Sequence, residues 1–106
     1  MITINQFLEI DLRVATILSA ERVPETDKLM KMEVNTGGET RQLVAGIAAV
    51  YEAEDLVGKK IVVVANLEPA TIRGVESRGM LLAADADGRP TLVSVPDDVP
   101  NGARVR

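Results

Sequence analysis

The residues that could do chemistry gather in the third quarter of the sequence. A β-branched run, Ile61 to Val64, leads through Asn66 into a Pro-containing loop, and the segment Gly74-Val75-Glu76-Ser77-Arg78-Gly79-Met80 follows. Because glycine enters φ > 0 at no steric cost, the two glycines predict sharp turns of the backbone. Turns of that kind would hold Ser77 and Arg78 toward solvent, where a hydroxyl and a guanidinium can donate hydrogen bonds to a ligand.

The sequence offers little for catalysis. Cysteine and histidine are both absent, which excludes a thiolate nucleophile, an imidazole base and an ordinary zinc site. Ser77 and Gly79 resemble part of a nucleophile-elbow motif, but Val75 stands where that motif needs glycine and no histidine can activate the hydroxyl. Asp85-Ala86-Asp87-Gly88 lacks the further ligands of a calcium loop and predicts a hairpin turn instead. We therefore expect no catalytic residue, no cofactor and no metal.

Length and composition predict one folded domain over residues 1–106. A chain of this size buries about two thirds of its unfolded surface without metals or disulfides, and a hydrophobic fraction of 46% is typical of a globular chain. The longest apolar run, residues 43–51, is much shorter than the roughly 18 residues that span a membrane, and the N-terminus has no signal-peptide pattern. We expect a cytoplasmic protein with no membrane partner.

Charge is distributed unevenly along the chain. A net charge of −4 counts against binding nucleic acid through bulk electrostatics. Between residues 56 and 80 the basic residues outnumber the acidic ones, with Lys59, Lys60, Arg73 and Arg78 against Glu68 and Glu76. Local basic patches are therefore compatible with the acidic total, and any affinity for nucleic acid would be modest and sensitive to salt.

The apolar pattern predicts an all-β fold with one short helix. A long curved strand is expected over residues 12–23, where bulges would explain the breaks in period two. Further strands are expected over residues 29–34, 40–47, 59–67, 80–86 and 91–95, with a helical turn between residues 47 and 58 and an extended or turn-like segment before residue 11. This order fits a five-stranded Greek-key OB barrel with a short helix between strands three and four and extra C-terminal strand segments. A small SH3-like barrel fits almost as well.

Several motifs together resemble a known family. Val63-Val64-Ala65-Asn66-Leu67, followed by the glycine-bracketed segment that ends at Met80, is similar to the tRNA-binding OB domain at the C-terminus of bacterial methionyl-tRNA synthetases and to free-standing structure-specific tRNA-binding proteins. Other family motifs occur in the same order, namely Asp11-Leu12-Arg13-Val14, Asp27-Lys28-Leu29, the run from Arg41 to Ala48, and Leu56-Val57-Gly58-Lys59. The resemblance spans nearly the whole chain and favours the OB barrel.

The resemblance implies a non-catalytic module that recognises the shape and backbone of tRNA. It implies a homodimer, with the N-terminal segment in the dimer contact, or a C-terminal domain or beta subunit that has the catalytic chain of methionyl-tRNA synthetase as partner. From the residues alone, the N-terminal segment is equally well read as an apolar lid over the core. By resemblance, tRNA contact falls on Lys28, Arg41, Asn66, Ser77 and Met80, and Arg78 and Arg73 are added as cations that this sequence places nearby.

The scarcity of aromatic residues favours one of two modes of RNA binding over the other. Phe7 and Tyr51 are the only ones, so base stacking on single strands is poorly supported, and recognition of a folded RNA through its shape and backbone remains. Two other functions stay open. A CsaA-type export chaperone, which binds peptide segments, shares the fold and the Asp11-Leu12-Arg13-Val14 motif, although residues 76–80 favour the tRNA-binding branch. A pure dimerisation module is the third.

Overall fold

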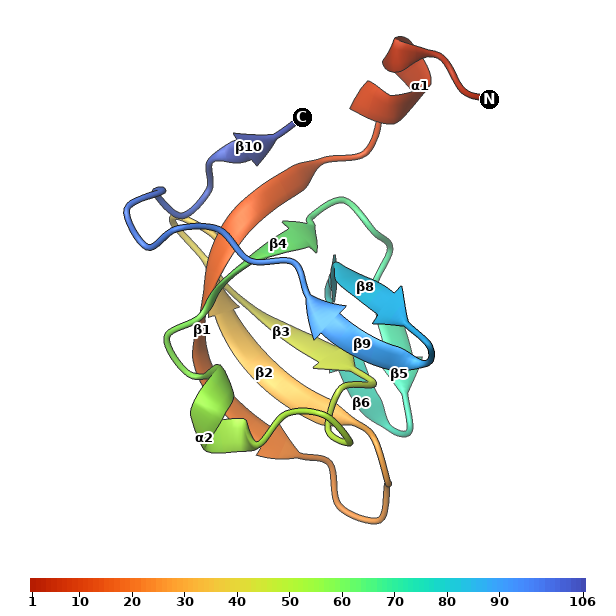
Figure 1. The fold of residues 1–106 in the computed structure, drawn as a ribbon, viewed down its shortest axis with the longest axis vertical. Helices are drawn as coiled ribbons and strands as arrows, with labels where there is room; N and C mark the ends of the chain where they lie inside the picture. The colour runs from red at the N-terminus through yellow and green to blue at the C-terminus, as the bar shows by residue number, and fades with distance from the viewer.

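The longest strand, β1 (Leu12–Arg22), organises the sheet in the computed structural model, which describes residues 1–106 (Figure 1). It pairs antiparallel with β2 (Met30–Asn35) and with β4 (Lys60–Val64). The ladder continues from β2 to β3 (Thr40–Ala45) and from β4 to β7 (Met80–Leu81), giving the order β3-β2-β1-β4-β7. The short C-terminal strand β10 (Arg104–Val105) pairs with the start of β1.

A register shift bends β1 in the middle. The pairing of β1 with β2 slips between Ile17 and Ser19, and Leu18 lies exposed there while Ile17 is buried. A bulge of this kind increases strand curvature, which lets one strand take part in both halves of a barrel. The prediction of a long, bulged first strand is therefore confirmed.

The barrel is nearly closed between β3 and the segment around β7. The N–H of Arg78 donates to the carbonyl of Gln42 on β3 at 2.8 Å, which links the last part of the barrel to the first. These five antiparallel strands and a short helix form the OB-like barrel that the sequence predicts. The helix, α2 (Ala53–Leu56), lies between β3 and β4, and Gly58 after it adopts a φ of +91°.

The core fills the barrel. Leu56 on α2 is fully buried, as are Ile17 and Ile61 on β1 and β4. The 13 buried residues of the core cluster are Ala15, Ile17, Met30, Met32, Val34, Leu43, Ala45, Ile47, Ala48, Leu56, Ile61, Val63 and Leu81. Neither helix has the length and apolarity needed to cross a membrane.

Two short hairpins lie outside the main sheet. Strands β5 (Ala70–Ile72) and β6 (Val75–Ser77) pair between β4 and β7, where the sequence predicts only a loop. The second hairpin, β8 (Ala83–Ala86) and β9 (Arg89–Leu92), turns at Asp87 and Gly88 as predicted. The predicted strand 80–86 is wrong in one respect: the chain leaves the main sheet at residue 82, so β7 and β8 belong to different sheets.

The N-terminal segment is a helix, which corrects the prediction of an extended or turn-like lead. The helix α1 (Ile4–Leu8) begins with a capping box, in which Thr3 and Gln6 exchange side-chain to backbone hydrogen bonds. A Thr three residues before a Gln is a sequence signal for such a start. No residue of α1 is buried, and the helix stands away from the barrel beside the C-terminus (Figure 1). It is therefore not a lid over the core.

Candidate functional site

Ser77 is buried, whereas the glycine-bracketed turn predicts that it points to solvent. It is 2% exposed, its Oγ accepts a hydrogen bond from the N–H of Val44 at 3.0 Å, and the hydroxyl donates to the carbonyl of Gly79 at 2.8 Å. Ser77 ends a strand on which Val75 is half-buried and Glu76 exposed, so the alternation of β6 turns it inward. The hydroxyl joins β6 to β3.

The two glycines beside Ser77 do adopt the predicted backbone conformations. Gly74 has a φ of +83° and Gly79 a φ of +125°. A Cβ at Gly79 would lie 2.9 Å from the carbonyl oxygen of Val64, whereas a Cβ at Gly74 would meet nothing within 4 Å. Gly79 therefore allows close approach to β4, while Gly74 allows only the turn.

Arg78 is exposed beside this buried hydroxyl. Its backbone is held by Gln42, whose Nε2 also donates to the carbonyl of Glu76 at 2.8 Å. Met80 follows on β7, half-buried and opposite Val64. The β3 to β6 contact thus fixes the backbone and leaves the guanidinium of Arg78 free of any salt bridge.

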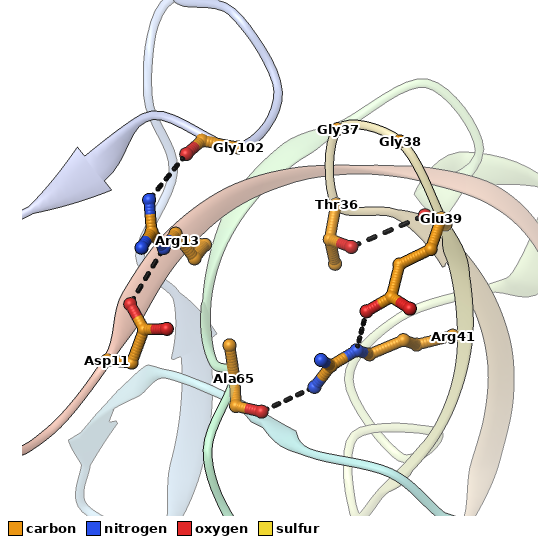
Figure 2. Close-up of a pocket in the computed structure, with 9 residues that line it drawn as sticks. All are labelled: Asp11, Arg13, Thr36, Gly37, Gly38, Glu39, Arg41, Ala65 and Gly102. Atoms are coloured by element: carbon orange, nitrogen blue, oxygen red, sulfur yellow. Dashed lines mark hydrogen bonds and ion pairs between the residues drawn. The ribbon is translucent and has the colours of Figure 1, made fainter.

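Arg41 lines a polar hollow of about 420 Å³ (Figure 2). Its Nε donates to Glu39 at 2.6 Å and its Nη1 to the carbonyl of Ala65. Arg13 enters the hollow from the opposite side, as Figure 2 shows, with its Nε 2.7 Å from the carboxylate of Asp11. Each arginine is matched by one carboxylate, so the hollow carries no net positive charge.

Asn66 lies at the end of β4, but both ends of its amide are occupied. Its Oδ1 accepts from the N–H of Asp11 at 2.9 Å, and its Nδ2 donates to the carbonyl of Glu9 at 2.7 Å. The side chain therefore fastens the segment before β1 to the end of β4. Sequence reasoning gives no sign of this role, because the partners are backbone groups more than 50 positions away in the sequence.

Lys28 lies in the loop between β1 and β2, beside the turn of the β5–β6 hairpin. A hollow of about 480 Å³ separates the two and is lined by Glu25, Thr26, Asp27, Lys28, Leu29, Ile72 and Arg73. Arg73 adopts a φ of +53° and donates from Nη2 to the carbonyl of Glu25 at 3.3 Å. Neither Lys28 nor Arg73 forms a salt bridge.

Lys31 differs from Lys28 and Arg73 because it is paired with a carboxylate. Its Nζ lies 2.7 Å from the carboxylate of Glu21, directly opposite on β1. The hydrogen bond that the Lys31 ammonium donates to Glu21, together with the negative charge of Glu21, raises the pKa of Lys31 above its ordinary value. Lys31 thus stays protonated but paired, and it does not add a free charge to this face.

The predicted site residues fall into two groups around the β5–β6 hairpin. Arg41, Asn66, Ser77, Arg78 and Met80 lie along β3, the end of β4 and the β6–β7 connection. Lys28 lies apart from them with Arg73, at the turn of the hairpin. Gln42 and Arg13 were not predicted; a glutamine and a paired arginine carry no distinctive sequence signal.

A nearly closed five-stranded barrel, with unpaired cations around a hairpin between its fourth and fifth strands, defines a small binding module of the OB class. The chain belongs to the family described as "Putative tRNA binding domain", whose model matches residues 12–104.

Individual relatives agree with this assignment. The chain is 54% identical over 106 residues to a methionine–tRNA ligase of Methanothrix thermoacetophila, and the match covers 100% of this chain and 16% of that protein. The chain thus spans about a sixth of the length of the relative. The resemblance to the tRNA-binding domain of methionyl-tRNA synthetases is confirmed.

Two solved structures share the whole fold. One is a MetRS related protein from Pyrococcus horikoshii, 41% identical with a TM-score of 0.96, where the match covers 100% of this chain and 98% of that one. The other is the chaperone CsaA from Bacillus anthracis, 30% identical with a TM-score of 0.89, covering 100% and 99%. The two solved chains therefore have about the same length as this chain.

Proposed function

We propose that this chain is a non-catalytic module that binds tRNA by its shape and backbone. The observation that carries the proposal is the set of exposed cations around the β5–β6 hairpin, namely Lys28, Arg73 and Arg78, none of which is paired with a carboxylate. Unpaired Lys and Arg side chains bind phosphates and release counterions, which gives affinity without sequence preference.

Base stacking has little support as an additional source of affinity. Tyr51 accepts a hydrogen bond at its hydroxyl from the N–H of Leu92 at 3.0 Å and packs against the core, and Phe7 lies on α1. Tyr51 is thus engaged by β9 and the core, and Phe7 lies on the N-terminal helix, so neither ring lines the hollow of Lys28 and Arg73. Phosphate and sugar contacts therefore make up the proposed interface, as in shape-selective binding of folded RNA.

The predicted site residues divide by role in this proposal. Lys28 and Arg78 contact the RNA backbone directly, and Arg41, with a side chain 26% exposed, contributes from the rim of its hollow. Ser77 and Met80 shape the edge from within, because the first is buried and the second half-buried. Asn66 differs from them, because its side chain is bound to the backbone of the N-terminal segment.

We further propose that the module acts as a homodimer through its N-terminal end or, within a longer protein, as an accessory domain or subunit of a cytoplasmic methionyl-tRNA synthetase. Large apolar side chains are exposed in the N-terminal segment and just after β4: Ile2 at 67%, Ile4 at 69%, Ile10 at 42% and Leu67 at 48%. Ile2, Ile10 and Leu67, together with Val64, line a hollow of about 640 Å³, whose lining also includes the polar residues Gln6, Glu9 and Asn66. Exposed apolar side chains beside an apolar hollow support a pairing of two copies about a two-fold axis.

The test of RNA binding is a mobility-shift titration with bulk tRNA and with single-stranded DNA of equal length, at low and near-physiological salt. We expect saturable binding that prefers tRNA and weakens with salt. A variant combining Lys28→Ala, Arg73→Ala and Arg78→Ala should bind at least tenfold more weakly. The matched control combines Lys59→Ala, Arg89→Ala and Arg106→Ala, which removes the same charge from exposed positions elsewhere and should change little.

A second candidate function is a peptide-binding chaperone of the CsaA type. It is favoured by the likeness to the chaperone CsaA along the full length of both chains. Suppression of the aggregation of an unfolded client, with no tRNA binding even at low salt, would move the function to this branch. A dimer that neither binds tRNA nor suppresses aggregation would indicate a module whose only function is dimerisation.

A further inference from the structure

Asn66 forms both of its side-chain hydrogen bonds with the backbone of the N-terminal segment. The amide binds on both sides of Ile10, accepting from Asp11 and donating to Glu9. The neighbouring Ala65 adds a backbone hydrogen bond, in which its N–H donates to the carbonyl of Asp11 at 2.7 Å. The segment that leads into β1 is thus fixed at three points by two consecutive residues.

These polar contacts matter because α1 has little else to hold it. None of its residues is buried, and a five-residue helix is not stable by itself in water. Besides the Asn66 contacts, Arg104 on β10 donates from Nη2 to the carbonyl of Leu8 at 2.9 Å. The orientation of α1 is therefore set by hydrogen bonds rather than by core packing.

The same backbone forms the apolar hollow. Leu67, which follows Asn66 directly, is one wall, and Ile10, whose flanking peptide groups Asn66 binds, is another. Loss of the Asn66 contacts would let the two walls separate and would let α1 leave its observed direction. A segment that is already ordered loses less conformational entropy when a partner binds.

We propose that Asn66 is a positioning residue for the pairing of two copies of this chain, and that it does not contact RNA. The proposal rests on the homodimer proposed above. The occupant of the hollow is the α1 segment of a second copy, because this segment carries the exposed Ile2 and Ile4 and because Ile2 itself lines the hollow of its own chain, so two copies that meet there bring both segments into contact. A two-fold axis then places the α1 segment of each copy in the hollow of the other, and in both copies Asn66 holds the α1 segment.

The experiment is sedimentation equilibrium of the full chain over a concentration series, without RNA, for the wild type and two variants. Asn66→Ala removes both side-chain hydrogen bonds and should raise the dimer dissociation constant at least tenfold, which corresponds to about 1.4 kcal/mol. Asn66→Asp keeps the acceptor for Asp11 but places a carboxylate oxygen against the carbonyl of Glu9. It should weaken the dimer at least as much.

A matched control is Asn35→Ala, which removes one comparable bond, from the N–H of Gly37 to Oδ1, in the β2–β3 hairpin. It should leave the dimer dissociation constant unchanged. Amide hydrogen exchange gives a second readout that does not depend on association. The N–H of Asp11 should exchange faster in Asn66→Ala and remain protected in Asn66→Asp.

The outcomes separate this inference from the proposed function. A wild-type chain that is monomeric throughout the series would overturn the homodimer and this inference with it, while tRNA binding would stand. A wild-type dimer with an unchanged dissociation constant in Asn66→Ala would overturn the inference alone. If that variant also lost affinity for tRNA, Asn66 would be assigned to the RNA contact instead.

Discussion

Two regions of the molecule differ in which kinds of side chain are buried and which are exposed. Where β6 meets β3, a polar residue, Ser77, is buried and serves structure, while cations project outward. At the N-terminal end, apolar residues are exposed and a polar residue, Asn66, holds the backbone in place. Residue type alone therefore does not distinguish a residue that binds a ligand from one that supports the fold. The partners of each polar atom do.

The two regions also differ in what holds them. The β6 edge is connected to the core through β3, so it moves only if the barrel opens. The α1 segment is held mainly by hydrogen bonds between exposed groups. Each such bond contributes about 1 kcal/mol to stability. Changes at the first region should therefore affect folding, and changes at the second should affect association.

The largest expected effect is on folding, from Gly79→Ala. An alanine at a φ of +125° is strained, and its Cβ would lie 2.9 Å from a β4 carbonyl, so the free energy of unfolding should fall by about 3 kcal/mol. Urea unfolding measures it. Gly74→Ala is the matched control, strained in φ but unobstructed, and should cost about 1 kcal/mol. If both variants lost the same free energy of unfolding, Gly79 would not lie close enough to β4 to exclude a Cβ.

Ser77→Ala should follow with a loss of about 2 kcal/mol in unfolding free energy, because the buried N–H of Val44 would have no partner. Thermal unfolding measures it. Arg78→Ala, at an exposed neighbouring position, should stay within about 0.5 kcal/mol of wild type. A fully stable Ser77→Ala variant that had lost tRNA affinity would return Ser77 to direct RNA contact and remove the contrast between the two regions.

Leu67→Ser should act on association and not on folding. Leu67 is 48% exposed and forms one wall of the apolar hollow, so removing it should raise the dimer dissociation constant about tenfold in sedimentation, with an unchanged unfolding midpoint. Val57→Ser, at an apolar position that is 51% exposed near α2, is the control. The same weakening in both variants would argue against a specific face.

The smallest expected effect is on salt dependence, from Arg78→Ala. If Arg78 contacts one phosphate, its removal should weaken tRNA binding a few-fold and reduce the slope of log affinity against log salt by about 1. Titrations at several salt concentrations measure the slope. Arg89→Ala, at an exposed position on β9, should leave it unchanged. An unchanged slope for Arg78→Ala would place the RNA elsewhere on the barrel.

Much of the barrel could be predicted from the sequence because its signals are local. Period-two alternation identifies β2, and the break in alternation within residues 12–23 marks a real bulge. The β5–β6 hairpin was missed because strands of three residues carry too little periodicity to detect. The α1 helix was missed although its capping box is a local signal, because its apolar residues also fit alternation.

The candidate site was harder to predict because its decisive contacts are distant in sequence. The partner of Ser77 lies 33 positions away and those of Asn66 lie 55 and 57 positions away. A sequence pattern can indicate that these residues matter, yet it does not say whether their hydrogen bonds go to a ligand or to the chain. Lys28, Arg73 and Arg78 are exposed and form no salt bridge, as the sequence suggests for cations that could contact a ligand.

Ala65 connects Arg41 and the N-terminal segment through its backbone hydrogen bonds. Its carbonyl accepts from Arg41 at the rim of the proposed RNA face, and its N–H donates to the carbonyl of Asp11 at the base of the N-terminal segment. One residue's backbone is thus bound from both sides. If RNA draws Arg41 away from that carbonyl and changes the affinity between two copies by some factor, then pairing must change RNA affinity by the same factor.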